Sequence, residues 1–298
     1  MTSGFARRAR RLGALAMLSL LTACAGFPEP QGPPRKEIIF AVTASMELIR
    51  FNAGQPQRVL SRQRVNGLAP GERLVGIDYR VARGILYALS ASGRLYTLDT
   101  ATATLQPVGS APSAVPLGDG LTGFDFNPVA DRIRVVTDTG RNLRLHPDTG
   151  AAVDGDPAQA GIQGDPALAY ASADRHAGQA PAVAAAAYTY NKQDERLSTN
   201  FAVDRRLGML VMQGSAEGRT PVVSPNTGLL TTIGSLGLGP LLDVSFDIAD
   251  VSGAAFVAVR TAAQPATRLH LVDLATGAAQ AIGTVGNGAP LVGMAVEP

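Results

Sequence analysis

Residues 121–145, LTGFDFNPVADRIRVVTDTGRNLRL, contain the clearest structural pattern in the chain. Two short runs rich in β-branched and apolar residues, 132–137 and 142–145, flank the pair Thr139-Gly140. Such runs around a turn-forming pair predict a β-hairpin. Polar and apolar residues alternate along both runs, so we expect one side of the hairpin to face solvent. The polar positions are Arg132, Arg134, Asn142 and Arg144.

The opening of this stretch, LTGFDFN at 121–127, recurs elsewhere in the chain. Clear copies are LVGIDYR at 74–80, DVSFDI at 243–248 and LVGMAV at 291–296, and a weaker copy, LAYASAD, stands at 168–174. Counted between their first residues, the spacings along the chain are 47, 47, 75 and 48 residues. Units of about 40–50 residues built from short strands are typical of β-propeller blades.

A second phrase marks the end of each unit. It reads DTATATLQPVG at 99–109, SPNTGLLTTIG at 224–234 and DLATGAAQAIG at 273–283, with a shorter version, HPDTG, at 146–150. Asp, Asn and Thr side chains bond the backbone of a tight turn, and glycine adopts the positive φ that other residues resist. Each closing phrase therefore predicts a hairpin turn.

Together the two phrases predict an all-β fold, a β-propeller of about five four-stranded blades. The long unit at 168–234 leaves room for a sixth blade, unless residues 191–225 form an insertion on one face. Three strand patterns near the N-terminus have no opening phrase of their own: 37–42, 47–51 and 58–65. Residues 291–296 supply one further strand. We therefore expect the N- and C-terminal strands to complete one blade and close the ring, which removes exposed sheet edges.

The opening phrase, G-[IF]-D-[YF]-[RN], and the strand sequence L-Y-x-L-D together carry a family resemblance. With the run at 121–136 and its continuation at 140–145, they resemble the bacterial domain-of-unknown-function family 4394. The resemblance covers nearly all of residues 37–298 and implies a secreted, propeller-like β-fold. It supplies no catalytic residues. The chain departs from the family pattern in the weakened phrase at 169–174.

The N-terminal segment has the layout of a secretory signal. Four arginines precede an apolar stretch at 12–21, which is too short to span a bilayer comfortably. Leu21-Thr-Ala-Cys24 resembles the bacterial lipobox, in which the cysteine is acylated and becomes the mature N-terminus. Ala25 follows Cys24 where an aspartate would favour retention in the inner membrane. The sequence therefore predicts lipidation of Cys24 and a place in the outer membrane.

These features divide the chain into three parts. They are a lipoprotein signal peptide at 1–23, a Pro-rich tether at 24–36 and a single propeller domain at 37–298. The four prolines of the tether predict an extended, semi-rigid spacer. We expect a protein of the bacterial cell envelope that is held to the membrane by its acyl chains and faces the periplasm.

Composition and charge exclude several classes of protein. A single Cys among 298 residues excludes a disulfide scaffold. Removal of residues 1–23, with four Arg and no acid, leaves 26 − 4 = 22 basic and 24 acidic side chains, a net charge of −2. No long basic run follows the first eleven residues, so we expect no nucleic-acid partner.

The acidic residue of the opening phrase is the main candidate for a binding site. Asp78, Asp125 and Asp247 occupy the same place in three copies. If that strand is innermost, the three carboxylates lie at one level around the axis and bind Ca²⁺ or a cationic ligand. The alternative is that each carboxylate caps its own blade turn through backbone N–H groups. No cofactor is expected, unless these carboxylates bind Ca²⁺.

Arg132, Arg134 and Arg144 form a second candidate. They belong to a solvated sheet face, or they contact an anionic envelope component such as lipopolysaccharide or peptidoglycan. The three histidines lie in different units, and no nucleophile–base motif or zinc-binding spacing occurs. This lack of chemistry favours a protein that is not an enzyme.

Three functions are compatible with the sequence. The first is a lipid-anchored, non-enzymatic binding or scaffold module, monomeric, with an envelope protein or glycan as its partner. The alternative is a metal-dependent propeller hydrolase or lactonase, in which the axial aspartates hold the metal. A third reading is a purely structural envelope protein. The fold alone does not choose among them.

Overall fold

A computed structural model describes residue 1 and residues 31–298 of the chain. The predicted signal peptide, Cys24 and the first part of the tether fall on residues 2–30 and therefore lie outside the described residues. In the described part, regular structure consists of β-strands and two short 3₁₀ helices, η1 (Val81–Arg83) and η2 (Pro225–Thr227). These residues form no helix long and apolar enough to cross a membrane.

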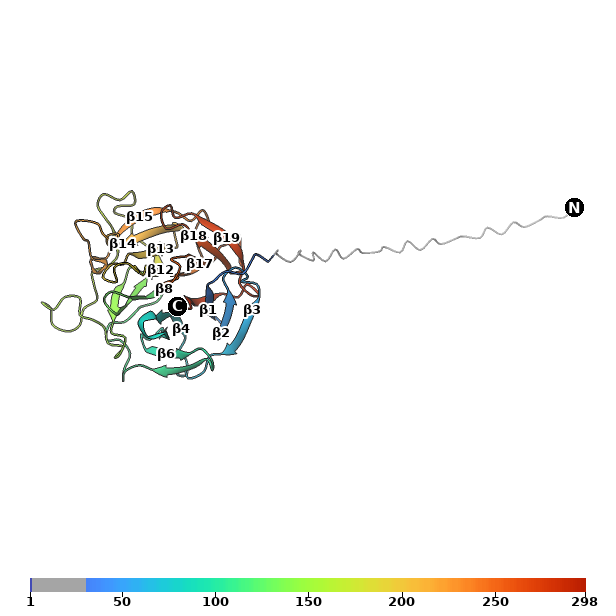
Figure 1. Ribbon diagram of the computed structural model, residues 1–298, viewed down its shortest axis with the longest axis horizontal. Coiled ribbons are helices and arrows are strands. Elements are labelled where there is room, and N and C mark those ends of the chain that lie inside the picture. Colours follow the sequence, from blue (N-terminus) through green and yellow to red (C-terminus); the bar gives the residue numbers. More distant parts are fainter. Residues whose placement is uncertain (2–30) are drawn as a thin grey trace. The chain divides into compact units, whose positions relative to one another are not determined.

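Five sheets follow one another around a central axis and form the blades of a β-propeller (Figure 1). From the axis outward, blade 1 consists of β20 (Leu291–Val296), β1 (Ile38–Thr43), β2 (Glu47–Asn52) and β3 (Val59–Arg64). Blade 2 consists of β4 (Leu74–Arg80), β5 (Ile85–Ser90), β6 (Leu95–Asp99) and β7 (Thr104–Pro107). Blade 3 consists of β8 (Thr122–Asn127), β9 (Arg132–Thr137) and β10 (Asn142–Leu145).

The remaining two blades complete the ring. Blade 4 consists of β12 (Val183–Tyr188), β13 (Asn200–Asp204), β14 (Met209–Gln213), β15 (Leu229–Ser235) and, at its outer edge, β11 (Ala169–Tyr170). Blade 5 consists of β16 (Asp243–Ile248), β17 (Ala255–Arg260), β18 (Arg268–Val272) and β19 (Ala279–Thr284). The innermost strands β4, β8, β12, β16 and β20 contact one another in that order around the axis.

The first and last strands of the propeller lie in the same blade. β20 pairs antiparallel with β1, with Ile39 opposite Val296 and Ala41 opposite Met294. The predicted closure of the ring by N- and C-terminal strands is therefore confirmed. Closure pairs one edge of β1 that would otherwise expose unpaired backbone groups.

The long unit contains one blade rather than two. Its innermost strand is β12, which carries no copy of the opening phrase. The weak copy at 168–174 instead includes β11, which pairs parallel with β15 at the outer edge of blade 4. The interpretation of 168–174 as an opening phrase is wrong, and the propeller has five blades. Blade 3 has only a single bridge, between Leu145 and Ala152, in place of a fourth strand.

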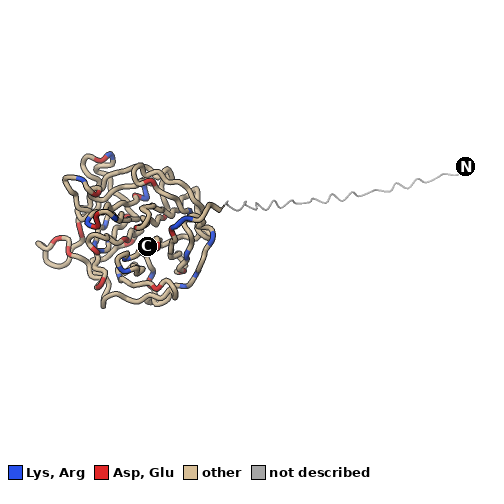
Figure 2. The backbone as a smooth tube through the Cα atoms, viewed as in Figure 1, with Lys and Arg blue, Asp and Glu red and all other residues tan. Residues whose placement is uncertain are grey.

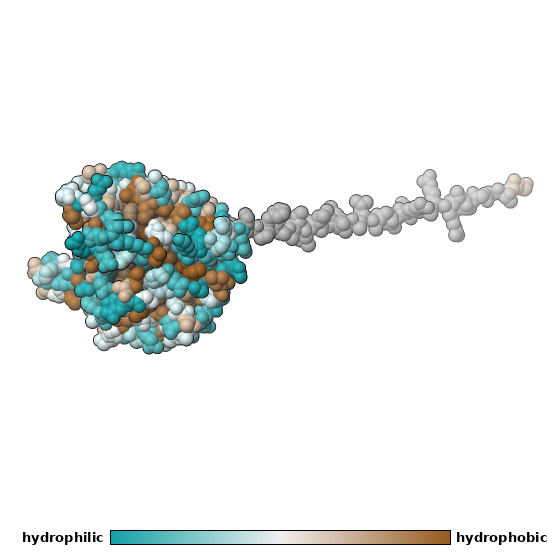
Figure 3. All heavy atoms as spheres, viewed as in Figure 1, coloured by the Kyte–Doolittle hydropathy of each residue, from teal (hydrophilic) through white to brown (hydrophobic). Residues whose placement is uncertain are grey.

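Buried apolar residues form one cluster at each of the five junctions between blades. Four of these clusters contain many apolar side chains from both blades. The cluster between blades 3 and 4 is smaller and contains only Val136 from the strands of blade 3. Seen from one side, hydrophobic residues lie in separate patches between hydrophilic ones (Figure 3). Acidic and basic residues are interspersed around the ring (Figure 2).

Glycines of the opening phrase let the inner strands pack closely and narrow the central channel at one level. A Cβ atom on Gly123 would lie 2.8 Å from the carbonyl carbon of Ala185 in the next blade, and one on Gly76 would lie 2.5 Å from the Cβ of Phe124. Real Cβ atoms do not approach so closely, so these positions require glycine. The space left on the axis at this level is only about 20 Å³. The channel is therefore almost closed by the inner strands themselves.

Candidate ligand site at the axis

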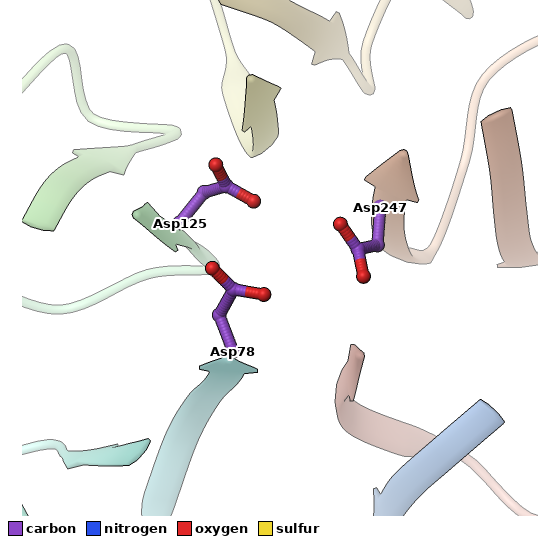
Figure 4. Close-up of side chains that lie close together, drawn as sticks. All are labelled: Asp78, Asp125 and Asp247. Atoms are coloured by element: carbon purple, nitrogen blue, oxygen red, sulfur yellow. The ribbon is translucent and has the colours of Figure 1, made fainter. Parts of the chain in front are cut away.

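Three aspartates of the innermost strands converge on the axis, two residues after the level of the glycines. Asp78 lies on β4, Asp125 on β8 and Asp247 on β16 (Figure 4). One carboxylate oxygen from each lies within 4.8 Å of the others. Because side chains alternate along a strand, the same place in each copy of the phrase faces the axis. The three residues predicted from the sequence are thus brought together.

Each of these carboxylates bonds the backbone of the following blade. The Phe126 N–H donates to Asp78 Oδ2 at 2.7 Å, and the Tyr188 N–H donates to Asp125 Oδ1 at 2.9 Å. The Val296 N–H donates to Asp247 Oδ2 at 2.6 Å. The expected backbone bonding therefore exists, but it joins neighbouring blades. Asp247 also accepts from its own strand, from the Ile248 N–H at 2.6 Å.

The same bonding pattern shows which residues take the aspartate's place in the other two blades. The donor in each bond is the residue that follows the aspartate position of the next blade. Because Tyr188 and Val296 are donors, the equivalent positions are Ala187 in blade 4 and Ala295 in blade 1. Both alanines are fully buried. The ring of five positions therefore carries three acids and two alanines.

Burial and mutual repulsion change the acidity of this cluster. Burial raises the pKa of Asp78 well above its usual range, and the nearby Asp247 carboxylate raises it further. Burial likewise raises the pKa of Asp125 well above its usual range, with additional contributions from Asp78 and then Asp247. Burial raises the pKa of Asp247 to about 7, although the bond from Val296 N–H opposes this rise. Near neutral pH the cluster therefore keeps protons that ordinary carboxyl groups release.

A cavity of about 370 Å³ opens above the aspartates. Tyr188 and Tyr190 lie along its wall, and the three carboxylates line it on the side of the axis. A fourth acid, Asp250, also lines the cavity, and burial raises its pKa to about 6. A cavity of this size suits a small ligand, and convergent groups with perturbed pKa values are typical of binding sites.

The donor set of the cavity suits a cation with oxygen ligands. Each aspartate accepts a hydrogen bond from the backbone N–H of the following blade through one carboxylate oxygen. Asp78 and Asp247 also accept one from the next residue of their own strand. Ca²⁺ takes six to eight oxygen ligands, so three carboxylates would supply part of its shell and water or a ligand the rest. A bound cation would also remove the repulsion that otherwise holds protons on the cluster.

A sequence model of one protein family matches most of this propeller. The matching family is described as a domain of unknown function, DUF4394, and the match covers residues 47–295. The chain belongs to the DUF4394 family. The match begins in β2 and ends in β20, so it includes all three axial aspartates of this DUF4394 chain. No curated protein matches the chain significantly.

Solved structures similar to the DUF4394 chain share little sequence with it. One is PorZ, a surface component of the type-IX secretion system of Porphyromonas gingivalis, at 13% identity and a TM-score of 0.38, with 86% of this chain and 28% of PorZ covered. YCF48 from Cyanidioschyzon merolae has 11% identity and a TM-score of 0.38, over 84% and 71%. A Bacteroides thetaiotaomicron protein of unknown function has 14% identity and a TM-score of 0.45, over 86% and 63%. The DUF4394 chain thus spans under a third of PorZ.

The arginines predicted on a sheet face lie in two different environments. Arg134 is only 2% exposed, and Asn142 on the neighbouring strand is buried as well. The expectation of a solvated face is therefore wrong for both residues. Their side of blade 3 packs against blade 4, where Arg134 donates to Asp165 Oδ2 at 2.7 Å and to Asn142 Oδ1 at 2.7 Å. Arg132 and Arg144 are half-buried at the edge of the same junction.

Two residues of the DUF4394 site were missed by reasoning from the sequence. Tyr188 follows Ala187 at the end of β12, a strand that carries no copy of the opening phrase. Asp250 follows Asp247 by three residues and lies just beyond the end of β16. An acid directly after an innermost strand is a signal that a search of the sequence could have used, whereas Tyr188 had no such signal.

Proposed function

We propose that this protein is a binding module of the bacterial cell envelope that holds a divalent cation, Ca²⁺, on its axial aspartates. The observation that carries this proposal is the convergence of three buried carboxylates within 4.8 Å at the base of a cavity of about 370 Å³. The hydrogen bonds that these aspartates accept from neighbouring blades need an oxygen acceptor but no negative charge, so they do not explain why three acids meet at one point. A cation bound there turns mutual repulsion into attraction.

The proposal of a lipid anchor is based on the sequence of the first 25 residues. The lipobox-like Leu21-Thr-Ala-Cys24 supports acylation of Cys24, and Ala25 supports transport to the outer membrane. In this proposal the monomeric propeller faces the periplasm and presents its axial cavity to an envelope protein or glycan. The membrane contact is made by the acyl chains, each methylene of which contributes about 0.8 kcal/mol on burial.

Thermal unfolding of the full-length chain in detergent tests the cation site. Circular dichroism is the suitable probe because the chain contains no Trp. At 100 times its Kd, Ca²⁺ should add about 2.7 kcal/mol to the free energy of unfolding. Asp125→Asn should abolish this gain, since the amide carries no charge but can still accept the bond from Tyr188 N–H. Asp119→Asn, at an exposed position away from the cavity, is the matched control.

The proposal fails if Ca²⁺, Mg²⁺ and Mn²⁺ all leave the unfolding temperature unchanged at pH 8. It also fails if Asp125→Asn and Asp119→Asn respond to Ca²⁺ equally. In the second case the cation binds elsewhere on the protein.

One observation favours a second function, a metal-dependent hydrolase or lactonase. Asp250 lines the same cavity as the axial aspartates and has a pKa of about 6. A carboxyl group that titrates near the working pH is suited to general acid–base chemistry. Ca²⁺-dependent hydrolysis of lactones, lost in Asp250→Asn while Ca²⁺ binding persists, would establish this function. Absence of turnover across lactones and esters would leave the binding module.

A further inference from the structure

A second cavity lies beside the axial one, at the polar junction between blades 3 and 4. Its volume is about 170 Å³. Three arginines line it, together with polar side chains of both blades, and no carboxylate does. The lining includes Arg132, Arg134, Arg144, Asn127, Tyr188 and Ser224. The apolar cluster at this junction is the smallest of the five, so the arginines stand where the other junctions have apolar packing.

The arginines of this cavity are only partly neutralised by the protein. The side chain of Asp165 is only 1% exposed, and it forms ion pairs with Arg134 at 2.7 Å and with Arg144 at 2.6 Å. Three guanidinium groups against this one carboxylate leave a local charge of 3 − 1 = +2. Arg132 makes a single recorded hydrogen bond, from Nη1 to the Asp131 carbonyl at 2.8 Å.

Donor groups of two arginines remain for a ligand. Arg134 donates hydrogen bonds from its guanidinium group to Asp165, Asn142, Asn226 and Tyr188. Arg144 binds through Nε and Nη2, and the described residues record no acceptor for its Nη1. Among the described residues, Nε and Nη2 of Arg132 likewise have no hydrogen-bond acceptor. A planar fork of unused N–H donors is the group that proteins use to bind carboxylate and phosphate.

The two cavities share a wall, and the aspartates on one side of it form no ion pair with the arginines on the other. Asn127 and Tyr188 line both cavities. The Tyr188 N–H donates to Asp125, while its hydroxyl accepts from Arg134 Nε at 3.4 Å. Asp125 and Arg134 lie directly opposite each other on β8 and β9, yet Arg134 pairs with Asp165 instead. An acidic and a basic pocket are thus kept side by side without neutralising each other.

We infer that the arginine cavity is an anion subsite of the axial site. Arg132 and Arg144 bind the carboxylate or phosphate group of a small ligand, and another oxygen of that ligand coordinates the cation held by the axial aspartates. The inference rests on the proposed function for its cation. The ligand class is therefore a small polar molecule with one anionic oxygen group. The tyrosines of the axial cavity provide flat surfaces for the rest of such a molecule.

Calorimetry on the full-length chain in detergent tests this subsite. The probes are galacturonate, which carries a carboxylate, and glucose 6-phosphate, which carries a phosphate, each with and without saturating Ca²⁺. Glucose serves as the neutral comparison. Arg132→Gln should weaken binding of the preferred anion about tenfold or more, because a charge-assisted hydrogen bond is lost. Arg58→Gln, an exposed arginine of blade 1, should bind as the wild type does.

Ca²⁺ and the anion should also help each other to bind. By linkage, the factor by which Ca²⁺ tightens the anion equals the factor by which the anion tightens Ca²⁺. Preference for galacturonate or for glucose 6-phosphate then identifies the source of the anionic group. Binding should weaken as the salt concentration rises.

The possible results separate this inference from the proposed function. If Ca²⁺ binds but Arg132→Gln leaves anion binding unchanged, the anion subsite is overturned and the cation site stands. If the anion binds through Arg132 while no cation binds, the subsite stands as an anion site and the cation proposal is overturned. Failure of both anions to bind, with or without Ca²⁺, overturns the subsite.

Discussion

The propeller contains two clusters of buried charge, and they are built in opposite ways. At the junction of blades 3 and 4, Arg134 and Asp165 are 2% and 1% exposed at their side chains and lie 2.7 Å apart. At the axis, Asp78, Asp125 and Asp247 are almost equally buried but carry charges of the same sign. The first cluster contains the counterion that its central arginine needs, whereas the second contains none.

This difference separates a structural role from a binding role. A buried ion pair with further hydrogen bonds fixes how two blades meet, and removal of one partner leaves an uncompensated charge. Like charges gathered without a counterion raise their own pKa values, and such perturbed groups are characteristic of functional sites. The comparison predicts that the same kind of substitution, Asp→Asn, acts differently in the two clusters: it lowers the free energy of unfolding at the paired cluster and flattens the pH dependence of stability at the axis.

The largest effect is expected at the paired cluster. Asp165→Asn leaves Arg134 buried without its counterion, so the free energy of unfolding should fall by about 3–5 kcal/mol. Unfolding monitored by circular dichroism measures this loss. Asp194→Asn removes an exposed ion pair with Arg196 and should have a far smaller effect, because solvent screens such pairs. Equal losses in the two variants would show that Arg134 does not depend on Asp165.

The pH dependence of stability should reveal the unpaired cluster. The axial carboxyl groups have pKa values above those of the unfolded chain, so between pH of about 4 and 7 the folded state holds protons that the unfolded state has released. The free energy of unfolding should therefore fall as pH rises through this window, by on the order of 4 kcal/mol for Asp247 alone. Measured from pH 4 to 8, Asp247→Asn should show a flatter profile than the wild type.

Acids distant from the axis titrate alike in both proteins and cancel in the difference between the two profiles. Asp78 and Asp125 do not cancel, because Asp247 contributes to their raised pKa values, and its loss flattens the profile further. Asp250 and the axial partners Asp78 and Asp125 remain in the variant, so some slope persists. Parallel profiles for wild type and Asp247→Asn would remove the basis for treating the axial cluster as unpaired charge.

Calcium should act most strongly where protons have left the axial cluster. At pH 8 and 100 times its Kd, Ca²⁺ should stabilise the protein by about 2.7 kcal/mol, and the gain should shrink towards zero at pH 5 at the same concentration. Melting curves at both pH values provide the measurement. A calcium effect that is independent of pH would place the cation away from the carboxyl groups with raised pKa.

The smallest effect distinguishes the arginines within the paired cluster. The side chain of Arg132 is half-buried and donates one hydrogen bond to the protein, so Arg132→Gln should change the free energy of unfolding by no more than about 0.5 kcal/mol. Arg134→Gln breaks the pair with Asp165 and should cost several times more. Chemical denaturation resolves the two. Similar losses would mean that Arg132 serves packing rather than a ligand.

Much of the fold was predictable because the blades repeat. Copies of the opening phrase mark the innermost strands of blades 2, 3, 5 and 1, and the ring closure, five-blade count and family membership are confirmed. The innermost strand of blade 4 was wrongly placed at 168–174, because Ala187 stands at the aspartate position of β12 and leaves that strand without the opening phrase. Residues 168–174 resemble the opening phrase in sequence, but they contain β11, an edge strand in which only two residues pair with β15.

The axial cluster was predictable from the same repetition, since one position in equivalent strands reaches one level of the axis. The arginine cluster was not. Asp165 lies 31 residues after Arg134 in a loop with no recurring pattern, and Asn226 lies 92 residues after it. Alternation on β9 shows that Arg134 faces one side of the sheet, but only the neighbouring blade determines whether that side meets water or protein.

The pairing of β1 with β20 also sets a kinetic condition on folding. The bond between Arg50 and Glu297 joins residues 247 positions apart, and the β1–β20 ladder spans a similar separation. Contacts this distant in sequence form slowly, because a long loop must close before any contact stabilises it. Val296, the donor to Asp247, belongs to that last ladder. We therefore expect the hydrogen bond from Val296 to Asp247 to form only when the ring closes, so that ring closure limits the rate at which a competent axial site appears.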